Sequence, residues 1–390
     1  MDPIRTAAQD LASDTVALRR DLHAHPEIAF EEVRTAGIVA DRLRSFGLEP
    51  RTGLGGTGVV AVLEGARPGR TVLARADIDA LPMPDDKTVE YRSTTVNACH
   101  ACGHDGHTAV LLSVARILSE RQADLRGRVV FVFQPAEEIV QGAAAMLADG
   151  ALDGIEADTA LGLHLSTMHP TGTVAVRAGP AMAAADAFRL IVRGRGGHAA
   201  KPNETVDPIV IAAHLITALQ TLVARETDPV DQAVLSITSV HGGTAFNIIP
   251  EEVELKGTLR SFDTATRERH RERIAALAAS IATGMRGSVA VDWRDGSPAV
   301  VNDETATERV RHVAEAIDDI DDVIVAAQTM GGDDMALWLR HAPGCYWFVG
   351  ARAGEASSFP HHHPSFDIDE AALPLAVELF TKVILDALDA

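Results

Sequence analysis

The chain has 390 residues, of which 46% are hydrophobic and 23% charged, and its formal net charge is −20. This length exceeds the roughly 250–300 residues that one hydrophobic core supports, so we expect two domains. The negative charge argues against binding to nucleic acid and to anionic membrane surfaces, because both require basic patches. An anionic substrate would need a local positive pocket or a metal ion.

The cysteine content and the beginning of the chain favour a cytoplasmic protein. The chain has only three cysteines, Cys99, Cys102 and Cys345. A small and odd number of cysteines does not indicate a disulfide framework. The segment Met1–Arg5 has no apolar signal core, and we find no run of about 18 apolar residues. We therefore expect no association with a membrane.

Helices and apolar strands alternate in the first half of the chain, which is typical of an α/β fold. Pro26 ends the first helix, and Gly47 ends the second. Asp105 is expected to cap the third helix, which would place His104 at the helix N-terminus. Helices are predicted at 8–21, 35–46, 108–115 and 142–149, and strands at 57–63, 71–76, 128–133 and 159–163.

Side chains that can bind metal follow three of these strands. Asp77, Glu138 and His164 each come at or just beyond the carboxyl end of a strand. Ligands of open α/β sheets gather at this edge. For Asp77 and Asp79 a second interpretation has equal weight, namely that they only cap a turn.

The middle of the chain has the β-α-β-β-α-β order of a ferredoxin-like domain. Its clearest element is a helix that begins with Asp207 as N-cap and Pro208 at the first helical position. We assign residues 182–297 to this inserted domain, and residues 1–181 plus 298–390 to the domain that it interrupts. The predicted elements are strands 188–195, 233–240, 252–262 and 288–293 and helices 207–225 and 264–286 of the insert, then helices 305–318, 334–340 and 370–388 and strands 323–327 and 344–350.

The segment Cys99–His107 combines two thiols, three imidazoles and a carboxylate. Thiolate, imidazole and carboxylate are metal ligands. The alternatives are a redox or structural zinc half-site formed by Cys99 and Cys102, and solvated histidines. The candidate ligands of the whole chain are Cys102, His104, Glu137 or Glu138, His164, and His361 or His362.

Five or six ligands exceed the needs of one tetrahedral ion and suit two ions about 3.5–4 Å apart. In the pair Glu137–Glu138, one carboxylate can bind metal while the other takes a proton from the attacking water. The alternative is that both open a helix, where the macrodipole favours negative charge.

Taken together, eight stretches in order along nearly the whole chain resemble the dinuclear-metal aminoacylase and carboxypeptidase family, which are peptidase M20-like amidohydrolases. The resemblance points to the branch of hippurate hydrolase and the indole-acetyl-amino-acid hydrolases. It implies an α/β fold, with a mixed-sheet, zinc-exopeptidase-like catalytic domain and an inserted ferredoxin-like α+β lid that also dimerises. The matching stretches are Leu22–Glu27, Arg75–Pro82, His100–His107, Pro135–Glu138, Gly162–His164, Gly196–Ala200, Asn247–Pro250 and His362–Pro364 with Asp369–Glu370.

The resemblance also implies roles for particular residues. Glu137 becomes the general base, and His198 reaches into the partner subunit's site to stabilise the oxyanion. Asn247 and Arg260 hold the substrate's carboxylate or amide. The alternatives are an incidental imidazole in a glycine turn for His198 and an ion pair on a strand face for Arg260. The implied metal ligands are Cys102, His104, Glu138, His164 and His362.

Some residues depart from the family pattern. Cys99 stands where methionine is usual, and Asp333–Met335 replaces a glutamate-aspartate-phenylalanine run. Pro84–Asp85 follows Leu-Pro where a glutamate is expected, and Asn203 stands near a usual histidine. None removes an expected ligand, and the first two leave the acyl preference open.

We therefore expect a dimeric amidohydrolase with two divalent ions per subunit, Zn²⁺ or Mn²⁺, with Co²⁺ or Ni²⁺ also suited. It would cleave N-acyl or aryl-acyl amino acids to a carboxylic acid and a free amino acid. The alternatives are the same machinery acting as a carboxypeptidase, dipeptidase or N-acetyl-diaminopimelate deacetylase, a non-catalytic metal- or ligand-binding protein, and thiol redox chemistry.

Overall fold

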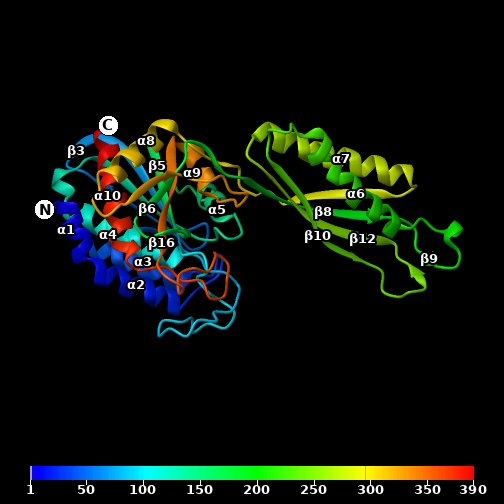
Figure 1. Cartoon of the computed structure of the whole chain (residues 1–390), viewed down its shortest axis with the longest axis horizontal. Helices are drawn as coiled ribbons and strands as arrows, with labels where there is room; N and C mark the ends of the chain where they lie inside the picture. The colour runs from blue at the N-terminus through cyan, green and yellow to red at the C-terminus, as the bar shows by residue number, and fades with distance from the viewer. Residues whose placement is uncertain (1, 295) are drawn as a thin grey trace. The chain divides into compact units, whose positions relative to one another are not determined.

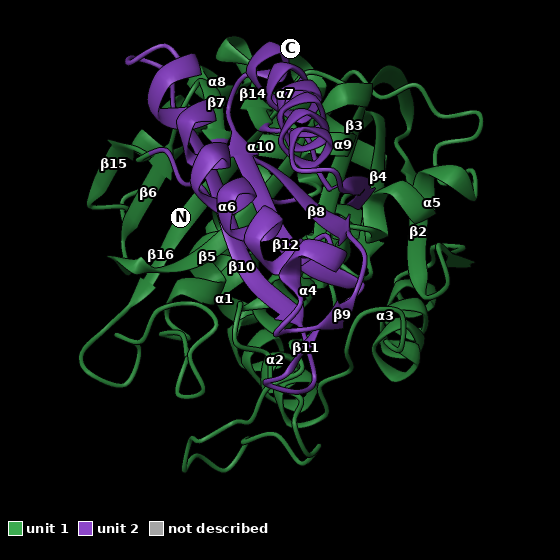
Figure 2. Cartoon of the chain, turned by 90° about the vertical axis from the view of Figure 1, so that its right-hand side faces the viewer, with its two compact units in different colours: residues 1–181, 300–327, 334–390 green, residues 182–299, 328–333 purple. Residues whose placement is uncertain are grey.

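The computed structural model describes residues 2–294 and 296–390, which divide into two compact units (Figures 1 and 2). Unit 1 consists of Met1–Ala181, Val300–Ala327 and Asp334–Ala390, and unit 2 of Met182–Ala299 and Gln328–Asp333.

One expected domain boundary was wrong. The segment Gln328–Asp333 was expected to belong to the interrupted domain, which was assigned residues 298–390 of the C-terminal part. In the structure it belongs to unit 2. The backbone N–H of Ala183 donates to Thr329 O (3.1 Å) and to Gly331 O (2.9 Å), which ties the segment to the first residues of unit 2. A segment of six residues that contains two glycines and only one large apolar side chain carries no pattern that reveals such a long-range pairing.

Unit 1 is built on a mixed sheet of eight strands in the order β1-β2-β4-β3-β5-β16-β6-β15. β3 is parallel to both β4 and β5, and β16 is parallel to β5, whereas β1, β2 and β6 supply antiparallel pairs. The strands are β1 Arg51–Leu54, β2 Gly58–Glu64, β3 Arg67–Asp77, β4 Arg126–Gln134, β5 Thr159–Pro170, β6 Thr173–Val176, β15 Asp322–Val325 and β16 Gly344–Arg352, and a separate pair is formed by β7 Gly179–Met182 and β14 Val300–Asn302.

One helix, α4, lies at the centre of the unit 1 core. It contacts β3 as well as α2 and α10 (Figure 1), and fourteen of its seventeen residues are buried, as expected for a helix that is apolar on most sides. The helices of unit 1 are α1 Pro3–Asp10, α2 Ala12–Ala24, α3 Val33–Ser45, α4 His104–Glu120, α5 Gly142–Ala148, α8 Glu304–Glu315, α9 Met335–His341 and α10 Ala372–Asp389.

Three local expectations were wrong. The predicted helix 8–21 is two helices, α1 and α2, joined at Leu11. The N-cap of α4 is Gly103 with a φ of +91°, and Asp105 lies in the first turn with its carboxylate bonded to other segments. β5 does not end at His164, because pairing with β16 continues from Phe348 opposite His164 to Arg352 opposite Pro170.

Unit 2 has four antiparallel strands in the order β10-β12-β8-β13, with two helices that contact the sheet. This strand order and the chain order β8-α6-β10-β12-α7-β13 are those of a ferredoxin-like fold. The elements are β8 Ala184–Arg193, α6 Pro208–Glu226, β10 Ala233–Gly242, β12 Glu252–Ser261, α7 Thr264–Gly284 and β13 Ser288–Arg294, with a small pair β9 Gly197–His198 and β11 Ile248–Ile249.

Among the described helices, α6 is long and apolar enough to cross a membrane, judged by length and composition only. In this structure Ile211, Leu215 and Leu219 on one side of α6 are buried in the core of unit 2. One side of α6 therefore packs into the core of unit 2, as is typical of a helix that covers one face of a sheet.

The cap of α6 provides a test of the local structure of unit 2. The Asp207 carboxylate accepts hydrogen bonds from the backbone N–H groups of Ile209 (2.9 Å) and Val210 (3.4 Å). We expect Asp207→Ala to lower the free energy of unfolding by about 1 kcal/mol, measured by urea denaturation followed by circular dichroism. Asp207→Asn keeps an acceptor and serves as control, so an equal loss in both variants would contradict the capping role.

Candidate metal centre

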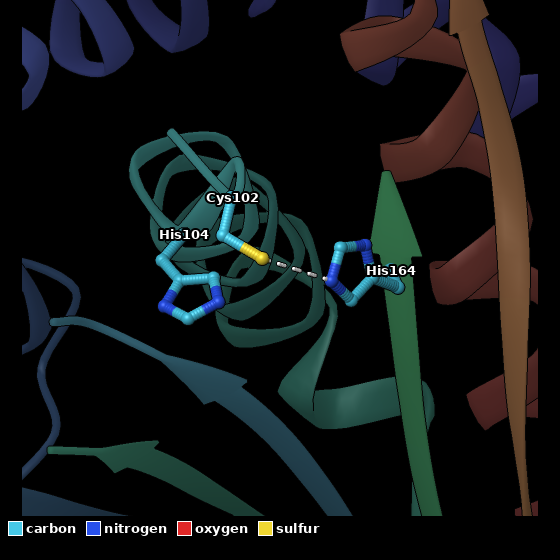
Figure 3. A group of neighbouring side chains, drawn as sticks. All are labelled: Cys102, His104 and His164. Atoms are coloured by element: carbon cyan, nitrogen blue, oxygen red, sulfur yellow. Dashed lines mark hydrogen bonds between the residues drawn. The ribbon is translucent and has the colours of Figure 1, made fainter. Parts of the chain in front are cut away.

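The candidate metal ligands come from four segments of unit 1 that converge beyond the carboxyl ends of β3 and β4. Cys102 precedes α4, His104 begins it, and Glu138 lies in a turn after β4. His164 lies within β5, and His362 lies in the loop between β16 and α10. Figure 3 shows the side chains of Cys102, His104 and His164 facing one another.

Two overlapping sets of ligand atoms lie within metal-binding reach. The ligand atoms of Cys102, His104 and His164 lie within 4.8 Å of one another, and so do those of Cys102, Glu138 and His362. Cys102 Sγ is 3.5 Å from His164 Nε2, and His362 Nε2 is 3.3 Å from Glu138 Oε2. Because Cys102 belongs to both sets, the arrangement fits two ions that share a ligand.

Two buried atoms at the centre of this cluster lack protein partners. Among the described residues, neither His104 Nε2 nor Glu138 Oε1 has a hydrogen-bond partner, and they are 3.9 Å apart. Leaving buried polar atoms unpaired costs about 1–3 kcal/mol each. Burial also raises the pKa of the Glu138 carboxyl to about 7 and that of the Cys102 thiol well above its usual value. A divalent cation would satisfy these atoms, so the residues fit a metal centre.

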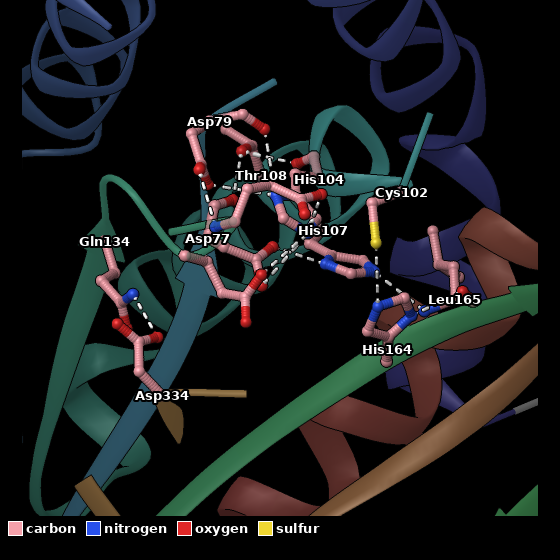
Figure 4. Close-up of polar contacts among 12 residues, drawn as sticks. Asp77, Asp79, Cys102, His104, His107, Thr108, Gln134, His164, Leu165 and Asp334 are labelled. Atoms are coloured by element: carbon pink, nitrogen blue, oxygen red, sulfur yellow. Dashed lines mark hydrogen bonds and ion pairs between the residues drawn. The ribbon is translucent and has the colours of Figure 1, made fainter. Parts of the chain in front are cut away.

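Asp79 contacts two of the candidate ligands, and Figure 4 shows it beside one of them, His104. His104 Nδ1 is 3.0 Å from Asp79 O and 3.2 Å from Asp79 Oδ1, which leaves Nε2 facing the cluster. The backbone N–H of Glu138 donates to Asp79 Oδ2 at 3.0 Å. Such outer partners of metal-binding histidines fix the ring orientation.

Hydrogen bonds distinguish the ligand histidines from their neighbours. His107 is already engaged at both nitrogens, because Nδ1 is 2.6 Å from Asp77 Oδ1 and Nε2 accepts the backbone N–H of Leu165 at 2.9 Å. His361 Nε2 is 3.0 Å from Leu165 O, whereas His362 Nε2 faces Glu138. Between the two adjacent histidines, the geometry therefore favours His362.

Asp77 is held by the cation Arg75 and by the histidine His107. Its Oδ2 is 2.6 Å from Arg75, whose guanidinium also contacts Asp334 Oδ1 at 3.0 Å. Arg75, Asp77 and Asp334 are all buried. Because Oδ1 of Asp77 bonds to His107, we interpret Asp77 as a support of the centre. The position of Asp77 and Asp79 directly after an apolar strand was the sequence signal for these residues. That signal does not distinguish a metal ligand from a residue that orients the ligands.

Glu137 is buried beside the cluster, with its Oε2 4.0 Å from His104 Nε2. It lies in a turn and does not open a helix, since α5 begins only at Gly142. The preceding Ala136 has a φ of +53°, and its backbone N–H donates to Glu32 Oε1 at 3.0 Å. Sequence analysis missed Glu32, because a glutamate more than one hundred residues away carries no local sign of this contact.

The residues expected to bind substrate lie in unit 2. His198 pairs with Ile248 in the β9–β11 ladder, and the backbone N–H of Ala199 donates to Asn247 O at 3.0 Å, so His198 and Asn247 are neighbours. Arg260 lies on β12, where its Nε donates to Thr258 Oγ1 at 3.1 Å. Their roles stay predictions.

Cys99 and Cys102 have different surroundings. Both are free thiols, as is Cys345. Cys99 lies with His23 and Asp85, its Sγ is 4.0 Å from Lys87 Nζ, and burial raises the pKa of its thiol to about 12. A protonated thiol is a poor nucleophile for disulfide exchange.

Comparison with known proteins identifies the family. The model of peptidase family M20/M25/M40 matches residues 73–386. The chain is 37% identical to N-acetylcysteine deacetylase of Bacillus subtilis, over 96% of this chain and 97% of that protein. It is 36% identical to IAA-amino acid hydrolase ILR1-like 2 of Arabidopsis thaliana, over 96% of this chain and 85% of that protein.

A solved structure agrees in fold. The Bacillus subtilis YxeP protein, described as a dinuclear metal binding peptidase from the M20 family, superposes with a TM-score of 0.85 and 34% identity over 98% of this chain and 99% of that one. The predicted mixed α/β fold and the predicted amidohydrolase class are thereby confirmed. The chain belongs to peptidase family M20/M25/M40.

Proposed function

We propose that this enzyme hydrolyses the amide bond of N-acyl or aryl-acyl amino acids, releasing a carboxylic acid and a free amino acid. The observation that carries the proposal is the buried cluster beside Glu137, in which His104 Nε2 and Glu138 Oε1 have no hydrogen-bond partner among the described residues. Relatives named as a deacetylase of N-acetylcysteine and a hydrolase of IAA-amino acids support this substrate class. Initial rates on N-acetyl, N-benzoyl and indole-acetyl amino acids, compared with dipeptides, test it.

In the proposed mechanism two divalent ions, Zn²⁺ or Mn²⁺, would be held by Cys102, His104, Glu138, His164 and His362. When bound, such ions acidify a water molecule and polarise a carbonyl group. Glu137 takes the proton of the attacking water and passes it to the leaving amine. His198 stabilises the oxyanion, while Asn247 and Arg260 hold the carboxylate or amide of the substrate. We also propose a cytoplasmic location, in keeping with three free thiols.

Replacement of the proposed base tests this division of roles. We expect Glu137→Gln to lower kcat by about 10²–10⁴-fold, because the amide cannot accept the proton. Metal content, measured by elemental analysis, is expected to stay at the wild-type level, since Glu137 is not a proposed ligand. Near-normal turnover, or loss of metal together with activity, would contradict the assignment.

The pKa of Glu138 predicts how metal affinity depends on pH. Because burial raises this pKa to about 7, the carboxyl must lose a proton to bind an ion below pH 7. We expect Zn²⁺ affinity to rise with pH more steeply below pH 7 than above it, by about an additional tenfold per pH unit. Titration of chelator-treated protein from pH 5.5 to 8.5 measures this, and a constant slope would show that Glu138 does not control binding.

We further propose a homodimer through unit 2. The exposed side of α6 includes the uncharged residues Ile209, Val210, Ala213 and Thr217, and the charged residues Arg225 and Glu226 lie at its C-terminal end. β10 is an edge strand of its sheet, and edge strands with unpaired backbone groups favour pairing with another chain. Both features suit an interface between two copies of the chain.

Mixed dimers test whether His198 acts on the partner's site. We expect His198→Ala alone to lower kcat by about 10²–10³-fold, as for the loss of one oxyanion donor. Refolding it together with Glu137→Gln should produce heterodimers with one intact site and activity that neither variant has alone. Native mass spectrometry verifies the heterodimers, and their inactivity would contradict a role across the interface.

A further inference from the structure

His362 is the least enclosed of the five candidate ligands. Its side chain is 55% exposed, whereas that of Glu138, its neighbour in the cluster, is 6% exposed. Its backbone has a φ of +64°, a conformation that is strained for a non-glycine residue and persists only when surrounding contacts hold it. One contact that fixes this backbone is made by His362 itself, because its N–H donates to Ala101 O at 2.8 Å.

A second segment holds the loop that carries His362. We call residues 83–98 the strap and residues 359–369 the His362 loop. The backbone N–H of Asp86 donates to Pro364 O (2.9 Å), Lys87 Nζ donates to Phe366 O (2.9 Å), and Tyr91 Oη donates to Asp367 Oδ2 (2.8 Å). Three contacts therefore join the strap to the loop within five residues of His362.

Among the three strap residues that make these contacts, Lys87 is the buried one. Its Nζ is 3.0 Å from Asp85 Oδ1, and Asp85 Oδ2 in turn accepts the backbone N–H of Ser93 at 3.0 Å. A buried ammonium group is tolerated only when it is paired and fully hydrogen-bonded. Its donation to a backbone carbonyl of the His362 loop thus fixes that loop to the strap.

The same polar network reaches the other end of the metal centre. Asp85 Oδ2 is 3.4 Å from His23 Nε2, and His23 Nδ1 is 2.6 Å from Asp105 Oδ2. Buried Arg19 bonds to Asp105 (2.8 Å) and to Asp367 (2.7 Å). Because Asp105 directly follows His104, the network connects the segment of Cys102 and His104 with the His362 loop.

We propose that Lys87 is a positioning residue that holds His362 opposite Glu138 and so sets the affinity of the ion bound on that side of the centre. The inference rests on the proposed function only in taking an ion to be bound there. Lys87 itself contacts no candidate ligand through any described hydrogen bond or ion pair, so it acts through the loop.

The experiment compares Lys87→Met and Tyr91→Phe with a matched lysine elsewhere in unit 1. Lys382 is also paired with carboxylates, Glu378 (2.6 Å) and Asp2 (2.7 Å), neither of which belongs to the centre. Chelator-treated wild-type and variant proteins are titrated with Zn²⁺ alone against a competing chelator. Stoichiometry and both dissociation constants are measured, and folding is monitored by circular dichroism.

We expect one of the two Zn²⁺ ions to bind about 10–100-fold more weakly to Lys87→Met, as when an outer partner of a ligand is removed. A smaller loss is expected for Tyr91→Phe, while Lys87→Arg and Lys382→Met retain wild-type affinity for both ions. A merely structural role would lower the melting temperature of Lys87→Met and leave both dissociation constants unchanged.

Wild-type affinity for both ions in folded Lys87→Met and Tyr91→Phe would overturn the inference. Should Lys87→Met not fold, Tyr91→Phe decides alone, and wild-type affinity in it overturns the inference. Failure of wild-type protein to bind two Zn²⁺ ions would instead overturn the proposed metal centre, so the two failures are distinguishable.

Discussion

Negative charge buried at the carboxyl edge of the unit 1 sheet is the constraint on which the rest of the structure depends. Asp77, Asp79 and Asp105 are all essentially inaccessible. Charges taken out of water must be paired, because their desolvation costs several kcal/mol each. Arg75 and Arg19 pair with Asp77 and Asp105, and Asp79 is occupied by His104 and the backbone of Glu138.

The group around Arg75 and Asp77 differs from the group around His104 and Glu138 in how many of its polar atoms have hydrogen-bond partners. Around Arg75 and Asp77 the oxygens and nitrogens find protein partners, which makes this group a rigid support. Around His104 and Glu138 the facing atoms find none among the described residues. Asp79 therefore orients His104 and Glu138, while their two facing atoms have no hydrogen-bond partner among the described residues. Outer partners of this kind are typical of metal sites.

Backbone conformation also positions the residues of the candidate site. Gly103, Ala136 and His362 all have positive φ, and each lies at or next to a candidate site residue. For Ala136 and His362 the conformation is held by hydrogen bonds from segments distant in sequence, through Glu32 and Ala101. Strained positions of this kind cluster at functional sites, where surrounding contacts over-determine them.

The sequence by itself determined the order of elements, the ferredoxin-like insert and the residue types of the metal cluster, since apolar periodicity, the Asp207–Pro208 cap and the Cys102–His104 motif are local signals. Only the tertiary structure decided that Asp105 pairs with Arg19 and does not cap α4, and that β5 continues past His164. Hydrogen bonds in the structure also favour His362, which the family resemblance implies as a ligand, over His107 and His361, whose nitrogens are engaged by Asp77 and Leu165. These choices depend on hydrogen-bond partners tens to hundreds of residues apart, and such partners leave no pattern in the neighbouring sequence.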